Sequence, residues 1–195
     1  AAQESRGLGD VYKRQAPGSD IAALLVFDHQ VTMHHRLVEA AYRARQSLFD
    51  SKLDPEETDV SKLSKGRSTD EFLEGRDKVV DYLLFRDETP IPKVSCAPAF
   101  RRAFAANRIA DSRKRSLKDL RLDGRIFENR CSYMIYSPTF DQFPPMLKGA
   151  IYARIHEILT SPKPVEGFDY LGKNEKRRIL EILDETKEDL PPGWL

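Results

Sequence analysis

The apolar residues of this chain recur mainly at spacings of three and four, which is the period of an amphipathic α-helix. The longest such segment covers 20–49, and the capping box Ser68-Thr69-Asp70-Glu71 opens a second segment that continues to about residue 85. Shorter segments follow at 98–107, 116–119, 145–160 and 174–187. Residues 131–143 are apolar and aromatic, and their pattern fits either a short buried helix or irregular packing.

The segments between these stretches are long and either charged or broken by proline. Residues 51–67 contain many charges and few apolar side chains, and residues 89–94 contain two prolines that end the second helix. No segment alternates apolar and polar residues as a half-buried strand does. We therefore predict an all-α fold, an irregular helical domain of about five to six helices with long loops.

The chain divides into a short leading segment and one domain. Residues 5–15, SRGLGDVYKRQ, look like the translated linker found at the ends of environmental sequencing reads. We expect residues 1–18 to be a non-native linker-like or disordered segment. Residues 19–195 are long enough to bury one core and are expected to form a single helical domain.

Composition and motifs argue against several classes of function. The chain is 40% hydrophobic and 32% charged, with a formal net charge of +1. This balance argues against a globally basic nucleic-acid binder, and no apolar run is long enough to predict a membrane span. The sequence contains no GxSxG, no phosphate-binding glycine loop and no HExxH, so it shows no hydrolase or transferase motif.

Three of the four histidines lie in the first helical segment, together with a methionine. These are His29, Met33, His34 and His35. Imidazole and thioether groups are good ligands for iron, but none of the histidines are four residues apart, so they do not form a two-histidine metal site on one face. A haem iron needs only one ligand from a helix, and His29 or Met33 would suffice.

A helical wheel of this segment assigns each polar side chain a position. The polar face contains Asp28 and Thr32, and the wide apolar arc is expected to include His34 as a core hydrogen-bonding group. His29 is predicted at the edge of that arc, stacked over Met33. His35 is predicted near solvent.

Two further features carry candidate chemistry. Residues 101–130 contain ten lysines and arginines against four acidic residues. This basic tract is expected to be a solvated surface, and in a functional interpretation it would bind anions such as haem propionates. Cys96 and Cys131 belong to no CxxC motif and are predicted to be two buried thiols, with a disulfide as the alternative in an exported protein.

Five stretches in a fixed order carry a family resemblance. They are LLVFDHQVTM, VVDYLLFRDETPIP, RSLKDLRLDGRIF, CSYMIYSPTFDQFPP and RRILEILDETKEDLP. In this order they resemble the C-terminal region of large, poorly characterised bacterial cytochrome-c-like (haem-binding) proteins. The resemblance implies that the chain is the C-terminal fragment of a larger, periplasmic or otherwise exported protein. Covalent haem attachment would then lie in a missing N-terminal region.

The resemblance also implies roles for particular residues. His29, or less favourably Met33, would approach the haem iron as an axial ligand, and Arg115 or Arg125 would meet the propionates. The partner would be the N-terminal cytochrome-like domain of the same protein, and the function electron transfer or another redox reaction. The alternative is a structural or interaction domain that packs on the cytochrome part without touching haem. The sequence identifies no redox partner, and a nucleic-acid partner is not expected.

Overall fold

The computed structural model describes residues 19–195, so the expectation for residues 1–18 lies outside the described part of the chain. Within that part the chain forms six α-helices and two short 3-10 helices, and the predicted all-α fold is confirmed. They are α2 (Ser19–Asp50), η1 (Val60–Lys62), α3 (Arg67–Leu83), α4 (Pro98–Ala105), η2 (Tyr133–Tyr136), α5 (Pro138–Asp141), α6 (Pro145–Thr160) and α7 (Lys173–Thr186).

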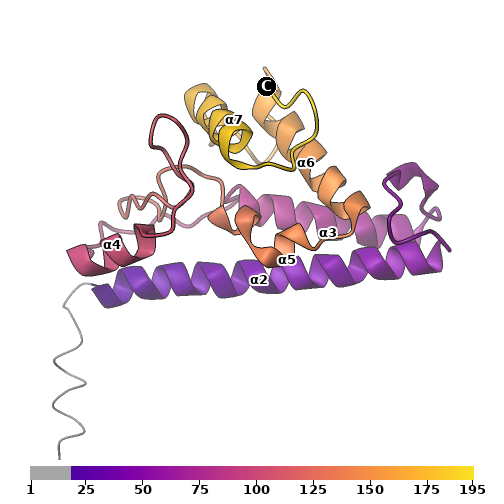
Figure 1. Cartoon of the computed structure of the whole chain (residues 1–195), viewed down its shortest axis with the longest axis horizontal. Coiled ribbons are helices and arrows are strands. Elements are labelled where there is room, and N and C mark those ends of the chain that lie inside the picture. Colours follow the sequence, from indigo (N-terminus) through magenta and orange to yellow (C-terminus); the bar gives the residue numbers. More distant parts are fainter. Residues whose placement is uncertain (1–18) are drawn as a thin grey trace, which may run out of the picture.

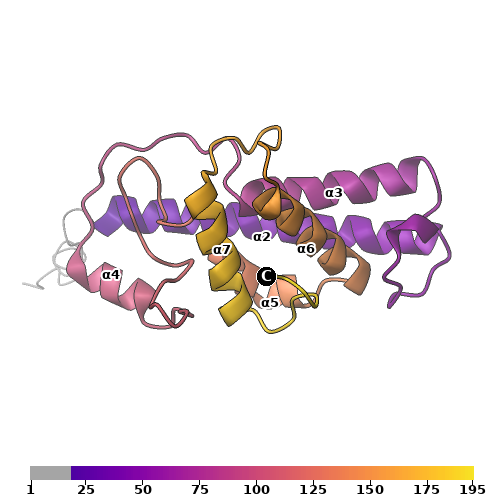
Figure 2. The same ribbon diagram turned by 90° about the horizontal axis from the view of Figure 1, so that it is seen from above.

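The 32-residue helix α2 is the base on which the other elements are arranged. Figure 1 shows α3 running back along α2, with α6 and α7 stacked above them and α4 near the start of α2. Seen from above in Figure 2, α6 crosses the α2–α3 pair and α7 crosses α2 beside the end of α3. Within residues 19–195 the remaining elements therefore lie on one side of α2, and none of them covers its opposite side.

The core is continuous from α2 through α3 to α6 and α7. It contains Met33 and Leu37 of α2, Val79 and Leu83 of α3, and a row of isoleucines and leucines from α6 and α7. Gly75 of α3 faces Ala40 of α2, and a Cβ atom added to Gly75 would lie 3.6 Å from the Cα of Ala40. The small residues at this point let the two backbones come together.

Residues 86–131 form mostly irregular structure around α4. Two isolated antiparallel bridges, Ile91 with Gly124 and Leu120 with Phe127, replace any longer strand in this region. The predicted helix at 116–119 is wrong. Asp119 accepts the Ser116 backbone N–H at 2.8 Å, but the chain closes a single turn and then enters the second bridge instead of continuing as a helix.

The other predicted helices exist, although several begin differently. The segment at 131–143 resolves into η2 and α5, and Ser132 and Ser137 cap them by accepting backbone N–H groups. The predicted capping box at Ser68 is wrong in detail, because α3 begins at Arg67 after Gly66 and no side chain caps it. Asn174 likewise lies inside α7, whose N-cap is Gly172. No helix within residues 19–195 is long and apolar enough to cross a membrane.

Candidate functional site

His29 lies on the buried side of α2, where three elements meet. Its side chain is only 3% exposed. The Nε2 atom of the imidazole is 2.7 Å from the hydroxyl oxygen of Ser132. That serine also caps η2 through its side chain and donates its backbone N–H to the carbonyl of Leu83 at the end of α3. The His29–Ser132 contact therefore ties α2, α3 and η2 together.

Aromatic rings surround the imidazole. It stacks on Phe85 and Tyr82 with ring centroids 4.9 and 5.3 Å away, and it meets the edge of Phe127 at 5.4 Å. Burial among these rings lowers the pKa of His29 from its ordinary value near 6.5 to about 4, since an apolar environment disfavours the charged imidazolium. His29 is therefore neutral at physiological pH.

Phe85 adopts an unusual backbone conformation to reach His29. Its φ of 59° lies in the left-handed region, which a residue with a side chain adopts at a cost of about 1–2 kcal/mol. This position follows the end of α3, where glycine is usual, and the N–H of Arg86 closes the turn onto the carbonyl of Asp81 at 2.8 Å. The stacking of Phe85 on His29 helps to offset the cost of this conformation.

The neighbours of His29 do not lie as the helical wheel predicts. His34 is exposed, and its nearest hydrogen-bonding group is the hydroxyl of Thr139 at 3.4 Å, so its predicted role in the core is wrong. His29 lies inside the core and not at the edge of it. The predicted exposure of His35 is confirmed, and Met33 is fully buried. Among residues 19–195, no group of three or more His, Cys, Asp or Glu side chains could hold a metal ion.

Most of the basic tract is engaged in ion pairs within the domain. Arg115 contacts Asp111 at 2.6 Å and Glu181 at 2.9 Å. Arg125 is buried and bonds to Glu175 of α7 at 2.8 Å. The expectation of a solvated surface is therefore wrong for Arg125, because the first turn of α7 supplies a carboxylate that the sequence places 50 positions away. Both candidate propionate ligands already have anionic partners.

These placements bear on the haem interpretation. An axial ligand needs a ring nitrogen or a sulfur atom that iron can reach. His29 is sealed by four aromatic rings with Nε2 bonded to Ser132, and Met33 is fully buried. In this conformation the four predicted residues do not fit a haem, and His29 and Met33 lie apart from any surface.

The two cysteines are free thiols. Cys131 is buried, as predicted, but Cys96 is half-buried, so the prediction of two buried thiols is wrong for Cys96. Burial raises the pKa of the Cys131 thiol to about 12, so it is not a reactive thiolate.

The outward side of α2 carries a feature that the sequence reasoning missed. Seven large apolar side chains are exposed along the helix: Ile21, Leu24, Phe27, Val31, Val38, Tyr42 and Phe49. We call this set the α2 apolar face. At 100° per residue these seven positions fall within one side of the helix. Large apolar side chains exposed together on one surface mark interaction sites in soluble proteins.

A seven-residue repeat of apolar residues in α2 could have revealed this face from the sequence. Leu24, Val31 and Val38 are spaced by seven residues, and so are Tyr42 and Phe49. A seven-residue apolar repeat is the pattern by which one helix packs against another.

Comparison of the chain with known protein families, with curated proteins and with solved structures finds no match. The site must therefore be interpreted from its own geometry.

Proposed function

We propose that residues 19–195 form an interaction domain that docks through the α2 apolar face. The partner is the N-terminal cytochrome-like domain of the same protein, which the sequence resemblance places before this one. The observation that carries the proposal is the row of seven exposed apolar side chains on a helix whose other side is fully packed. The domain holds the cytochrome region in place and contributes no ligand to its haem.

The size of the α2 apolar face suits a stable contact. A specific interface takes about 800 Å² from each partner. Three aromatic side chains bury about 150–250 Å² each, and four aliphatic ones add to them, so the face supplies an area of that order. Its seven-residue spacing fits an amphipathic helix of the partner, with side chains of each helix lying between those of the other.

The position of the face also suits a partner that precedes this domain. Ile21 and Leu24 lie in the first two turns of α2, so a chain that enters at Ser19 reaches the face without crossing the domain. The redox function and the exported location that the resemblance implies belong to the same proposal. Electron transfer would reside in the cytochrome region, and His29 would act as a buried hydrogen-bonding group of the docked domain.

Photo-crosslinking tests the docking. A photoreactive phenylalanine analogue is placed at Val31 in the longer protein, once the preceding reading frame has been recovered. We expect crosslinks to the preceding region after illumination. The same analogue at Lys65, which is exposed in the loop before α3, should give none. Crosslinks between two copies, or equal yields at both positions, would contradict the proposal.

The haem is tested separately. The preceding region should contain a CxxCH sequence, and its absence would overturn the cytochrome partner. In the haem-loaded protein, His29→Gln should leave the Soret band and the reduction potential unchanged, because the imidazole is sealed in the core. A shift in either quantity would identify His29 as a ligand and would contradict its role as a buried hydrogen-bonding group.

A further inference from the structure

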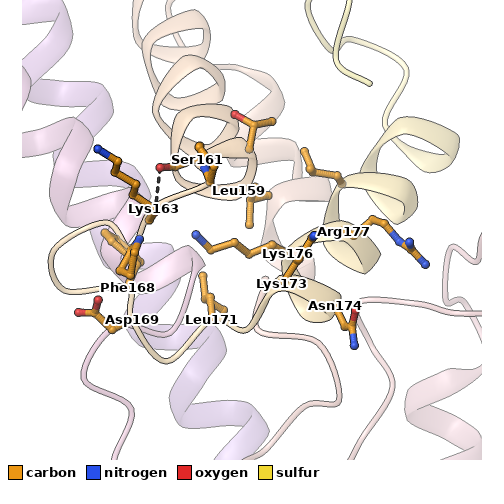
Figure 3. Close-up of a pocket in the computed structure, with 14 residues that line it drawn as sticks. Leu159, Ser161, Lys163, Phe168, Asp169, Leu171, Lys173, Asn174, Lys176 and Arg177 are labelled. Carbon is orange, nitrogen blue, oxygen red and sulfur yellow. Dashed lines mark hydrogen bonds between the residues drawn. The ribbon is translucent and has the colours of Figure 1, made fainter.

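A cavity of about 570 Å³ lies between the end of α6 and the beginning of α7. Figure 3 shows the loop after α6 folding around it. Its floor is apolar and includes Phe168, Leu171 and Leu180, whereas lysines from the loop and from α7 line its polar side. The volume lies within the range of about 300–1,000 Å³ that small-molecule sites occupy.

Lys176 is the unusual residue of this cavity. Its side chain belongs to a residue that is only 8% exposed, and Figure 3 shows its amine extending into the hollow between Ser161 and Phe168. Within residues 19–195 it has no hydrogen bond or ion pair. The other buried lysine, Lys187, is 9% exposed and lies 2.6 Å from Asp141.

The same contrast holds for the other buried charges. Asp111 pairs with Arg115, and Arg125 pairs with Glu175. Among the buried charged residues of the described part of the chain, Lys176 alone lacks an opposite charge within ion-pair distance. An anion that enters the cavity would give the Lys176 amine the charged partner that it lacks within the described residues.

The first turn of α7 adds a second group of donors. Its N-cap is Gly172, which has no side chain to accept from the helix. The N–H groups of Glu175 and Lys176 bond to the carbonyl of Gly172, whereas those of Lys173 and Asn174 have no partner within residues 19–195. Both of these residues line the cavity. Free N–H groups at a helix N-terminus attract anions.

The opposite wall decides how a ligand would lie. Helix α6 ends at Thr160 on that wall, and the carbonyl groups of its last turn repel negative charge. Asp169, the one acidic residue of the lining, would also repel it. An anionic group must therefore sit on the α7 side, beside Lys176, and leave the apolar floor for an uncharged part of the ligand.

We propose that the α6–α7 cavity binds a small organic oxyanion, a phosphate or carboxylate group attached to an apolar body. The anionic group bonds to the amine of Lys176 and to the N–H groups of Lys173 and Asn174. The apolar body packs against Phe168, Leu171 and Leu180. This site is independent of the α2 apolar face, which lies at the base of the domain.

Phenyl phosphate and benzoate are suitable probes, with inorganic phosphate and benzyl alcohol as partial ligands. Titration of the whole chain, followed by amide chemical shifts, should move the Lys173 and Asn174 resonances with one of the two aromatic anions. The stronger binder identifies the oxyanion. Each partial ligand should bind at least tenfold more weakly, because it lacks either the apolar body or the charge.

Two variants that each remove one positive charge complete the test. Lys176→Met should weaken binding of the aromatic anion at least tenfold, since it removes the amine that pairs with the anionic group. Lys65→Met, at an exposed position away from the cavity, should leave the affinity unchanged. Unmoved Lys173 and Asn174 resonances at millimolar probe, or equal losses in the two variants, would overturn the proposal.

Discussion

The two sides of α2 differ in an unexpected way: a histidine is buried on one side, and large apolar side chains are exposed on the other. The buried side contains His29, held by Ser132 at 2.7 Å, beside Met33 and Leu37. The outward side contains Leu24, Phe27 and Val31, which are large apolar side chains exposed to solvent. A polar ring is thus built into the core while apolar rings remain outside it. The difference makes His29 part of the scaffold, and the exposed apolar side chains are the basis of the docking proposed above.

Alanine substitutions on the buried and on the exposed side of α2 should differ most in their effect on the free energy of unfolding. Met33→Ala removes a fully buried side chain and should lower the free energy of unfolding by about 2–5 kcal/mol. Leu24→Ala shortens an exposed side chain of the same helix and should change it by no more than about 0.5 kcal/mol. Urea unfolding of the two variants measures both values. Equal losses would mean that the outward side is packed within the domain.

Acid should act on the buried side through His29. Its pKa is about 4 in the folded protein and near 6.5 when exposed, so the unfolded chain binds more protons between these values. Stability should therefore fall as the pH drops from about 6.5 to about 4. At 1.36 kcal/mol per pKa unit, the total loss is about 3 kcal/mol.

His29→Gln isolates this contribution, because glutamine can still bond to Ser132 but does not titrate. The variant should lose the part of the pH dependence that belongs to the imidazole. Glu88, whose pKa is raised by burial, titrates in both proteins and cancels in the difference. Denaturant unfolding at several pH values between 4 and 7 gives the comparison. Parallel pH profiles for the two proteins would show that His29 is already accessible to protons.

The sequence predicted the helices well but not the side of α2 that faces the core. Helix positions follow from local periodicity and from proline. The prediction that Pro144-Pro145 starts a helix that ends at about Thr160 agrees closely with α6. The choice of side depends on α3 and η2, which reach α2 from far along the chain. Apolar residues occur on both sides of α2, so a single wheel could not distinguish His34 from His29.

The contacts of the candidate site could not be predicted, because the residues that form them are far apart in the sequence. Ser132 lies 103 positions from His29, and Glu175 lies 50 positions from Arg125. Neither pair has a local sequence pattern. The 116–119 segment failed in the opposite way, because Ser116 and Asp119 form the local bonds of a helix start but the bridge from Leu120 to Phe127 takes the chain elsewhere. Tertiary contacts therefore determine the His29–Ser132 bond, the Arg125–Glu175 ion pair and the path of residues 116–119.

The smallest effect is expected at the contact between Gly75 of α3 and Ala40 of α2. A Cβ atom on Gly75 would meet Arg43 and Ala40 at 3.5 and 3.6 Å, which are ordinary contact distances, so Gly75→Ala fits. It should stabilise the protein by about 0.5–1 kcal/mol, because glycine is entropically costly within a helix. Gly149 of α6 has open space around it, and Gly149→Ala should give a similar gain. The two sites should diverge with a larger residue, since Gly75→Leu must push α2 and α3 apart whereas Gly149→Leu need not move any neighbour. Melting temperatures of the four variants test this, and equal tolerance of leucine at both sites would show that the buried side of α2 is not closely packed at Ala40.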